Sequence, residues 1–186
     1  MTTATISRPK TYTPDEFLNL PNGKMYELVD GKLVRRRVGQ ESSWVETIII
    51  SILQNFVSQR RLGFLFSASI GMKIFPDHGR IPRPDVAFVR RERLPGGRPS
   101  GGFLETVPDL VVEVISLRDN ASALERKLRE YREVGIPLIW VVYPATRTVR
   151  IIRENEFETT LKVGDLLDGE PALPGFSCEV AEFFPE

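Results

Sequence analysis

The fold is decided by DLVVEVIS at residues 109–116, ASALERKLREYREV at residues 121–134 and LIWVVY at residues 138–143. The first and last stretches are short, nearly continuous apolar runs, which is typical of strands buried on both faces of a sheet. The middle stretch has apolar residues at helical spacing, and Gly135 and Pro137 close it. We therefore expect a strand–helix–strand crossover, a connection that joins parallel neighbouring strands.

Hairpin, strand and helix patterns flank this unit on both sides. Asp30-Gly31 lies between two short apolar runs in residues 25–37, and this dipeptide strongly favours a two-residue hairpin turn. A helix start is expected at Thr13-Pro14-Asp15-Glu16, and a long helix at residues 42–59. Further strands are expected at residues 64–74, 82–89, 148–153 and 157–163, with a Gly- and Pro-rich loop at residues 91–102.

These elements predict an α/β fold: a mixed β-sheet with flanking helices and an N-terminal β-hairpin. We expect a single domain over residues 1–186, of which residues 1–11 are disordered. The 25 Lys and Arg residues balance 25 Asp and Glu residues, which excludes a strongly basic coat for non-specific nucleic-acid binding. One Cys and one His cannot build an internal disulfide or the usual structural zinc site. The longest apolar run, residues 138–143, is far shorter than the roughly 20 residues that cross a membrane, so we expect a cytoplasmic protein with no membrane partner.

Two carboxylates stand out against the apolar pattern of the expected sheet. Glu113 lies in the middle of an apolar run, where burial of a carboxylate is costly unless a partner or a metal ion holds it. The alternative to a functional Glu113 is a structural one: Glu113 forms an ion pair with an arginine, or it faces water from an edge strand. Asp85 follows Pro84 at the start of another expected strand. On its own Asp85 is better explained as a turn or cap residue. A functional role for Asp85 is favoured only when it is considered together with Glu113.

A single lysine lies on the inward face of the helix expected at residues 121–134. With about 100° per residue, the apolar residues of this segment form one buried stripe: Leu124, Leu128, Tyr131 and Val134. Lys127 falls inside this stripe, whereas the arginines and glutamates of the segment fall outside it. An inward ammonium group needs a nearby anion, or else it extends along the rim of the core to reach water. The preceding strand carries Glu113, so a carboxylate partner is available.

Two carboxylates near strand ends and one inward ammonium group form a set suited to phosphodiester chemistry. Asp85 and Glu113 supply the oxygen ligands that Mg²⁺ prefers, and the backbone carbonyl of Val114 is a further candidate ligand. A bound metal ion lowers the pKa of its water and neutralises developing phosphate charge. Lys127 is suited to orient that water or to stabilise the anionic transition state. The expected cofactor is therefore Mg²⁺, or Mn²⁺ in its place.

Seven motifs follow one another along the chain in a recognisable order. They are YELVDGKLV at residues 26–34, RPDV at 83–86, PDLVVEVIS at 108–116, Lys127 with Tyr131, GIP at 135–137, WVV at 140–142 and LPGF at 173–176. In order and spacing they resemble the Uma-two family of putative restriction endonucleases, in the PD-(D/E)XK nuclease superfamily, over about residues 12–184. The resemblance implies a restriction-endonuclease-like fold and a metal-dependent endonuclease that hydrolyses DNA.

The motif of that family carries over residue by residue, with one departure. The resemblance implies that Asp85 and Glu113 are its acidic pair and that, with Lys127, they are the catalytic residues. Ile115 stands where the written motif has lysine, so that role falls to Lys127 on the following helix. The candidate accessory residues are Glu46, Lys73 and Tyr131. A solvated helix residue is the alternative for Glu46, and Lys73 is the replacement if Lys127 only follows the rim.

Arginine clusters reconcile a neutral chain with a DNA substrate. Residues 80–98 carry six arginines against two acidic residues, and residues 35–37 form a second cluster. Arg83, Arg90 and Arg91 are the candidate contacts to backbone phosphates, with solvated loop arginines as the alternative. Cleavage of both strands of a duplex usually needs two sites, so a homodimer is expected for this class.

Two other functions compete with the nuclease. A catalytically silent nucleic-acid-binding or assembly module on the same fold suits the displaced lysine and the zero net charge. The presence of Asp85, Glu113 and Lys127 counts against it, because a silent protein need not retain a costly buried carboxylate. A hydrolase with Ser116 as its nucleophile is poorly supported, because the single histidine, His78, lies in a loop that contains Gly and Asp.

Overall fold

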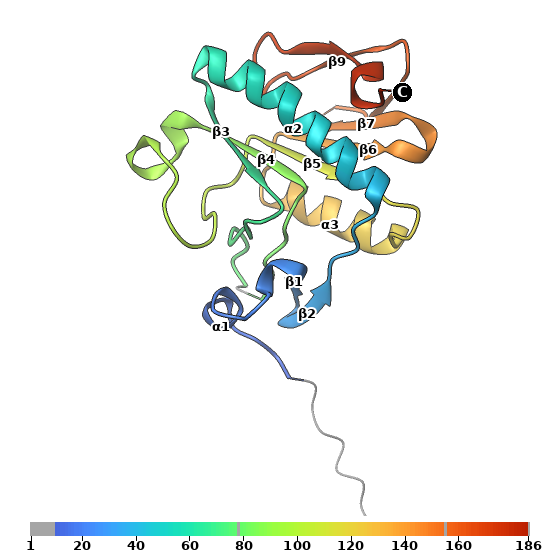
Figure 1. Ribbon diagram of the computed structural model, residues 1–186. Helices are drawn as coiled ribbons and strands as arrows, with labels where there is room; N and C mark the ends of the chain where they lie inside the picture. The colour runs from blue at the N-terminus through green and yellow to red at the C-terminus, as the bar shows by residue number, and fades with distance from the viewer. Residues whose placement is uncertain (1–9, 78, 155, 186) are drawn as a thin grey trace, which may run out of the picture.

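The computed structural model describes residues 10–77, 79–154 and 156–185, and a six-stranded sheet forms its centre (Figure 1). Helix α2 (Gln40–Arg60) crosses one face of this sheet, and helix α3 (Ala121–Glu133) covers the other (Figure 1). The predicted α/β class, with a mixed sheet, flanking helices and an N-terminal hairpin, is confirmed. Residues 1–9 of the segment expected to be disordered, and His78, lie outside the described residues.

The central sheet has the strand order β3-β4-β5-β6-β7-β8. Its strands are β3 (Gly63–Ser67), β4 (Val86–Arg90), β5 (Leu110–Val114), β6 (Leu138–Tyr143), β7 (Thr148–Arg153) and β8 (Thr159–Lys162). Two small antiparallel sheets lie outside it: β1 (Tyr26–Val29) with β2 (Lys32–Arg35), and β9 (Leu166–Asp168) with β10 (Ser177–Glu179). The other helical pieces are α1 (Pro14–Leu18) and 3₁₀ turns at Gly23–Met25, Arg91–Arg93, Pro95–Gly97, Pro144–Thr146 and Val180–Phe183. Within the ranges described above, no helix combines the length and the apolar character needed to cross a membrane.

The crossover predicted from the sequence is present. Strands β5 and β6 pair in parallel, with Glu113 opposite Val141, and α3 connects them. The other neighbouring strands of the central sheet pair antiparallel. Strand β5 is buried along its whole length and β6 nearly so, as their apolar runs predict. Glu113 therefore stands on a central strand, and the edge-strand alternative is wrong.

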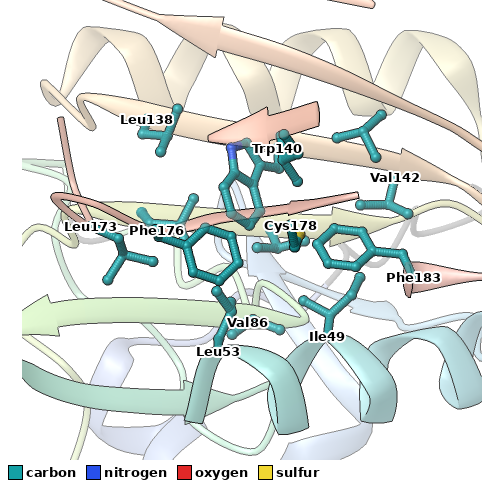
Figure 2. Close-up of a cluster of buried hydrophobic side chains, with 14 of the residues drawn as sticks. Ile49, Leu53, Val86, Leu138, Trp140, Val142, Leu173, Phe176, Cys178 and Phe183 are labelled. Carbon is teal, nitrogen blue, oxygen red and sulfur yellow. The ribbon is translucent and has the colours of Figure 1, made fainter. Parts of the chain in front are cut away.

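The α2 face of the sheet packs against a continuous apolar core. Figure 2 shows Trp140 of β6 beside the rings of Phe176 and Phe183, with Ile49 and Leu53 of α2 across from them. The ring centroid of Trp140 lies 5.8 Å from that of Phe176 and 6.1 Å from that of Phe183. Aromatic packing of this kind buries large apolar areas and fixes ring positions. The C-terminal segment thus holds β6, and with it β5, in a rigid sheet.

The opposite face of the sheet packs against α3. Leu128 and Tyr131 are fully buried there, and Leu124 and Val134 are partly buried against the same cluster. These four residues are the stripe predicted from the helical phase. The prediction for the inward face of α3 is therefore confirmed.

Strand boundaries differ from the prediction where turns and prolines intervene. The strand expected at residues 64–74 ends at Ser67, where the chain turns and Ile70 N donates to the carbonyl of Ser67 at 3.0 Å. The strand expected at residues 82–89 begins at Val86, because the prolines just before it have no N–H for a sheet ladder. The hairpin of β9 and β10 has strands of three residues each, too short to show an alternating pattern in the sequence.

Candidate active site

Glu113 is the buried carboxylate at the centre of the candidate site. Strand alternation directs its side chain to the α3 face of the sheet. Lys127 and Tyr131, four residues apart on α3, both reach it. Lys127 Nζ lies 2.8 Å from Glu113 Oε1 and 3.0 Å from Oε2, and Tyr131 Oη donates to Oε1 at 2.8 Å. The inward orientation predicted for Lys127 is confirmed, and its side chain does not follow the rim outward.

Asp85 lies beside Glu113, immediately before β4. The antiparallel register of β4 and β5 brings Asp85 across from Glu113. Its Oδ2 accepts a hydrogen bond from Val114 N at 2.7 Å, and its Oδ1 accepts one from Arg36 Nη2 at 3.0 Å. Arg36, which the sequence shows only as a member of an arginine cluster, is the counterion of Asp85 in the structure. The turn or cap alternative for Asp85 is therefore wrong, because its carboxylate accepts hydrogen bonds from β5 and from Arg36, which lie far from it in the sequence.

Glu27 is a third carboxylate of the site, and sequence patterns did not reveal it. It comes from β1, and its Oε1 accepts hydrogen bonds from Lys127 Nζ and from Arg83 N, both at 2.8 Å. A bridge between Leu28 and Ile81 attaches the hairpin to the segment before β4 and so positions Glu27. In the sequence Glu27 alternates with the inward Leu28, so strand periodicity predicts a side chain that faces water. Its contacts with Lys127 of α3 and with the segment before β4 shield it from water.

A pocket of about 180 Å³ opens beside these groups, between the hairpin, α2, β5 and α3. Six acidic and six basic residues line it, so their formal charges balance. Four of the acidic residues are Glu27, Glu46, Asp85 and Glu113. Burial raises the pKa of Glu46, and the nearby charge of Glu113 adds to that shift. Glu46 is thus a pocket residue rather than a solvated helix residue.

Burial raises the pKa of both central carboxyl groups, Asp85 to about 6 and Glu113 to about 7. The positive charge of Lys127 opposes both shifts, and the charge of Asp85 adds to that of Glu113. Burial alone would lower the pKa of Lys127, but the charges of Glu113 and Glu27 outweigh it and raise that pKa. Burial alone would raise the pKa of Glu27, but Lys127 holds it below its usual value. Lys127 is therefore protonated at neutral pH, and the central carboxyl pair favours an added cation.

The donor set fits a hydrated divalent cation. Among the residues that the structure describes, no group of three or more His, Cys, Asp and Glu side chains is arranged to hold a metal ion. Mg²⁺, however, is usually bound by one or two carboxylates and keeps several waters. A carboxylate offers about four acceptor positions, and the contacts above leave some free on Asp85 and Glu113. The N–H and carbonyl of a strand residue point to the same neighbouring strand, so the carbonyl of Val114 is directed to the side of Asp85.

Arg83 and Lys73 do not present free cations at this pocket. The guanidinium of Arg83 donates to the carbonyls of Tyr26 and Ser69 at 3.0 and 2.7 Å, and only 5% of the residue is exposed. Arg83 therefore fastens the hairpin to the sheet and is not available to a phosphate. Lys73 Nζ pairs with Glu105 Oε1 at 3.1 Å, outside the residues that line the pocket. Its position does not support Lys73 as a replacement for Lys127.

Arg90 and Arg91 lie at the far end of β4 from Asp85. Arg90 donates to the carbonyls of residues 171 and 172 in the C-terminal segment, and Arg91 lies 4.8 Å from the ring centroid of Phe64. Neither residue lines the pocket. The structure therefore does not bring these two candidate phosphate contacts to the carboxylates, because β4 extends away from the site.

The chain is similar to known proteins in sequence and in fold. The model of the family Uma2, described as "Putative restriction endonuclease", matches residues 14–181. A crystal structure from Anabaena variabilis, described as "a putative nuclease belonging to DUF820", has a TM-score of 0.78 at 20% identity, over 92% of this chain and 97% of that one. No curated protein matches the chain. The structural likeness shows a shared fold, and since the family match spans most of the sequence, the chain belongs to the Uma2 family of putative restriction endonucleases.

Proposed function

We propose that this protein is an endonuclease that uses Mg²⁺ or Mn²⁺ to hydrolyse phosphodiester bonds of DNA. The observation that carries the proposal is the convergence of the side chains of Asp85, Glu113 and Lys127 on one pocket. Membership of the family supports the same class of activity. The homodimer and the cytoplasmic location expected for this class stay predictions.

The two central carboxylates would hold the metal ion together with the carbonyl of Val114. The bound ion supplies a water of lowered pKa and neutralises charge on the phosphate. Tyr131 Oη donates to Glu113 Oε1 and so fixes the orientation of that carboxylate. Asp85 is oriented in the same way by Val114 N. Each ligand is therefore already held in place by a neighbour on a rigid element.

Lys127 acts in this proposal as a fixed positive charge, not as a base. Its pKa is raised by Glu113 and Glu27, in spite of burial, so the amine keeps its proton at neutral pH. An ammonium group has three donors, of which Glu113 and Glu27 accept two. The remaining donor is suited to a non-bridging oxygen of the scissile phosphate, where negative charge develops in the transition state.

A catalytically silent module is the competing function, and metal binding separates the two. The ion pairs of Asp85 with Arg36 and of Glu113 with Lys127 are contacts that a silent protein would also keep. We expect calorimetry to detect Mn²⁺ binding to the wild type, loss of binding in Glu113→Gln, and unchanged binding in Glu105→Gln, a matched change outside the pocket. Supercoiled plasmid should be nicked only by the wild type and Glu105→Gln, and only with metal. A wild type that neither binds Mn²⁺ nor nicks DNA would overturn the proposal.

A further inference from the structure

An open groove leads away from the pocket toward the start of α2. One wall is the segment of residues 35–40 between β2 and α2, and the other is the loop of residues 116–120 between β5 and α3. Arg36, Val38 and Asn120 line both the pocket and this groove, so the two form one continuous depression. A shallower hollow continues past Val38 to Trp44. We call this depression the lateral groove.

Exposed apolar side chains gather along the lateral groove. Nine large apolar side chains are exposed in the described part of the chain, and four of them lie here: Val34, Val38, Trp44 and Leu117. Single exposed apolar residues need no explanation, but a cluster beside a candidate active site marks a surface that binds a ligand. Leu117 is 85% exposed, Val38 66% and Trp44 49%. Their flat or branched faces are accessible to an aromatic ring.

The walls of the groove also carry exposed positive charge. Arg35, Arg37 and Arg118 are all exposed there. Arg37 donates to the backbone carbonyl of Arg118 and so connects the two walls. Three acidic residues also line the groove: Glu27 pairs with Lys127, Asp119 accepts from Ser116 N at 2.7 Å within its own loop, and Glu41 is exposed. The guanidinium groups of Arg35 and Arg118 therefore present a surface complementary to phosphate groups, whereas that of Arg37 already donates to a backbone carbonyl.

We propose that the lateral groove binds a single strand of DNA and leads it into the pocket. The bases would lie against Val38, Trp44 and Leu117, and the phosphates at the exposed arginines. This inference rests on the proposed endonuclease function and specifies its substrate as DNA with a single-stranded segment. In a duplex the base faces are stacked on one another, so a protein ring can stack only on an unpaired base. A duplex would instead place phosphates against these apolar side chains, at a cost in desolvation.

Tryptophan fluorescence tests the contact directly, because the chain carries two tryptophans and only one faces the groove. Trp140 is fully buried, whereas Trp44 is half exposed. In the experiment an oligothymidylate of about 12 nucleotides is added stepwise to the protein. EDTA is present so that metal-dependent cleavage cannot occur. Stacking should quench the Trp44 emission. Trp44→Phe should abolish this fluorescence change, while anisotropy of a labelled oligonucleotide still reports binding.

Matched variants separate the groove from the general charge of the surface. Leu117→Ser and Arg118→Ala should each weaken single-strand binding by about 5-fold or more, and Arg118→Ala should also reduce its salt dependence. Phe157→Ser and Arg129→Ala, the same changes at exposed positions outside the groove, should bind like the wild type. A duplex of the same length should bind about 10-fold more weakly than the single strand.

The outcomes distinguish this inference from the proposed function. Metal-dependent plasmid nicking together with equal or tighter duplex binding would overturn the inference and leave the function standing. If single-stranded DNA binds and quenches Trp44 but the protein never cuts DNA, the result would support single-strand binding in the lateral groove and would contradict the proposed endonuclease function. If no DNA binds and Leu117→Ser converts a dimer to a monomer in sedimentation, the groove joins two copies of the chain and the inference is wrong.

Discussion

Lys127 Nζ on α3 lies 2.8 Å from Glu27 Oε1 on β1, although the two residues are 100 positions apart in the chain. The same ammonium group lies 2.8 Å from Glu113 Oε1 on β5. One cation is therefore shared by a carboxylate of the small N-terminal hairpin and a carboxylate of the central sheet. The N-terminal hairpin thus contributes a side chain to the candidate site.

Glu27→Gln tests this sharing. The amide oxygen can still accept from Lys127 and from Arg83 N, but the negative charge is gone, so the pKa of Lys127 should fall. We expect the free energy of unfolding to drop by about 1–2 kcal/mol, because a partly buried cation loses one of its two counterions. Urea denaturation measures this, with Glu105→Gln as the control. Mn²⁺ affinity should change little, and identical denaturation curves for the variant and the wild type would contradict the prediction.

Lys127→Ala should separate metal binding from cleavage. Lys127 is not a metal ligand, so Mn²⁺ affinity should stay nearly intact once Glu113 is ionised. The charge of Lys127 lowers the pKa of Glu113, so the affinity of the variant is measured over a range of pH above 7. Plasmid cleavage should fall by about 10²-fold or more, the scale for loss of one transition-state donor. Lys127→Arg should not restore full activity, because a planar guanidinium cannot occupy the same point. Arg129→Ala, on the outer face of α3, is the matched control, and equal cleavage by the wild type and Lys127→Ala would remove Lys127 from the mechanism.

Arg36→Met should raise metal affinity while it lowers the stability of the metal-free protein. Arg36 Nη2 lies 3.0 Å from Asp85 Oδ1 and therefore competes with any cation for that carboxylate. Without Arg36 the charge of Asp85 lacks its counterion, so the metal-free protein should unfold at lower temperature. Added Mn²⁺ should raise the unfolding temperature more in Arg36→Met than in the wild type or in Arg35→Met. A smaller rise in Arg36→Met would show that Arg36 assists metal binding instead.

The raised pKa values of the two central carboxyl groups predict how stability depends on pH without metal. The pKa rises from 3.8 to about 6 for Asp85 and from 4.5 to about 7 for Glu113. Between these values the folded state binds more protons than the unfolded state, so the free energy of unfolding falls as the pH rises. For Asp85 this window runs from about pH 4 to about pH 6.

Asp85→Asn isolates the contribution of that one group. The stability of the variant relative to the wild type should increase between about pH 4 and about pH 6, since only the wild type loses a proton there. Urea denaturation in EDTA across this range measures the difference. In the control Glu105→Gln, the free energy of unfolding should change with pH in the same way as in the wild type. A difference between Asp85→Asn and the wild type that is independent of pH would show that Asp85 titrates normally.

Local periodicity was enough to predict the scaffold of the site. The apolar runs of β5 and β6 and the apolar stripe on α3 are properties of short segments. They can therefore be recognised from neighbouring residues alone, without knowledge of the tertiary structure. The same helical phase placed Lys127 inward, and a carboxylate in the middle of β5 had to find a partner. A functional role for Asp85 was favoured only together with Glu113 and through the family resemblance; that it lies across from Glu113, immediately before β4, is a finding of the structure.

Residues whose role depends on docking between distant segments could not be found in this way. Glu27 has the phase of a solvent-facing strand residue, and it is shielded because Lys127 of α3 and Arg83 before β4 both contact it. Arginine composition was also a poor guide. Arg83 and Arg90 read as cations available to DNA, yet each donates to backbone carbonyls that only the folded chain brings near. Charge counts cannot show which guanidinium groups the fold itself has already engaged.

The distance in sequence between the hairpin and its lysine sets an order of events during synthesis. A ribosome adds about 5–20 residues per second, so Glu27 is made about 5–20 s before Lys127. In that interval the nascent chain holds Glu27 without the ammonium group that neutralises it. The complete set of charged groups can therefore assemble only after α3 has left the ribosome. A growing chain would therefore lack the complete candidate site until most of the protein had been made.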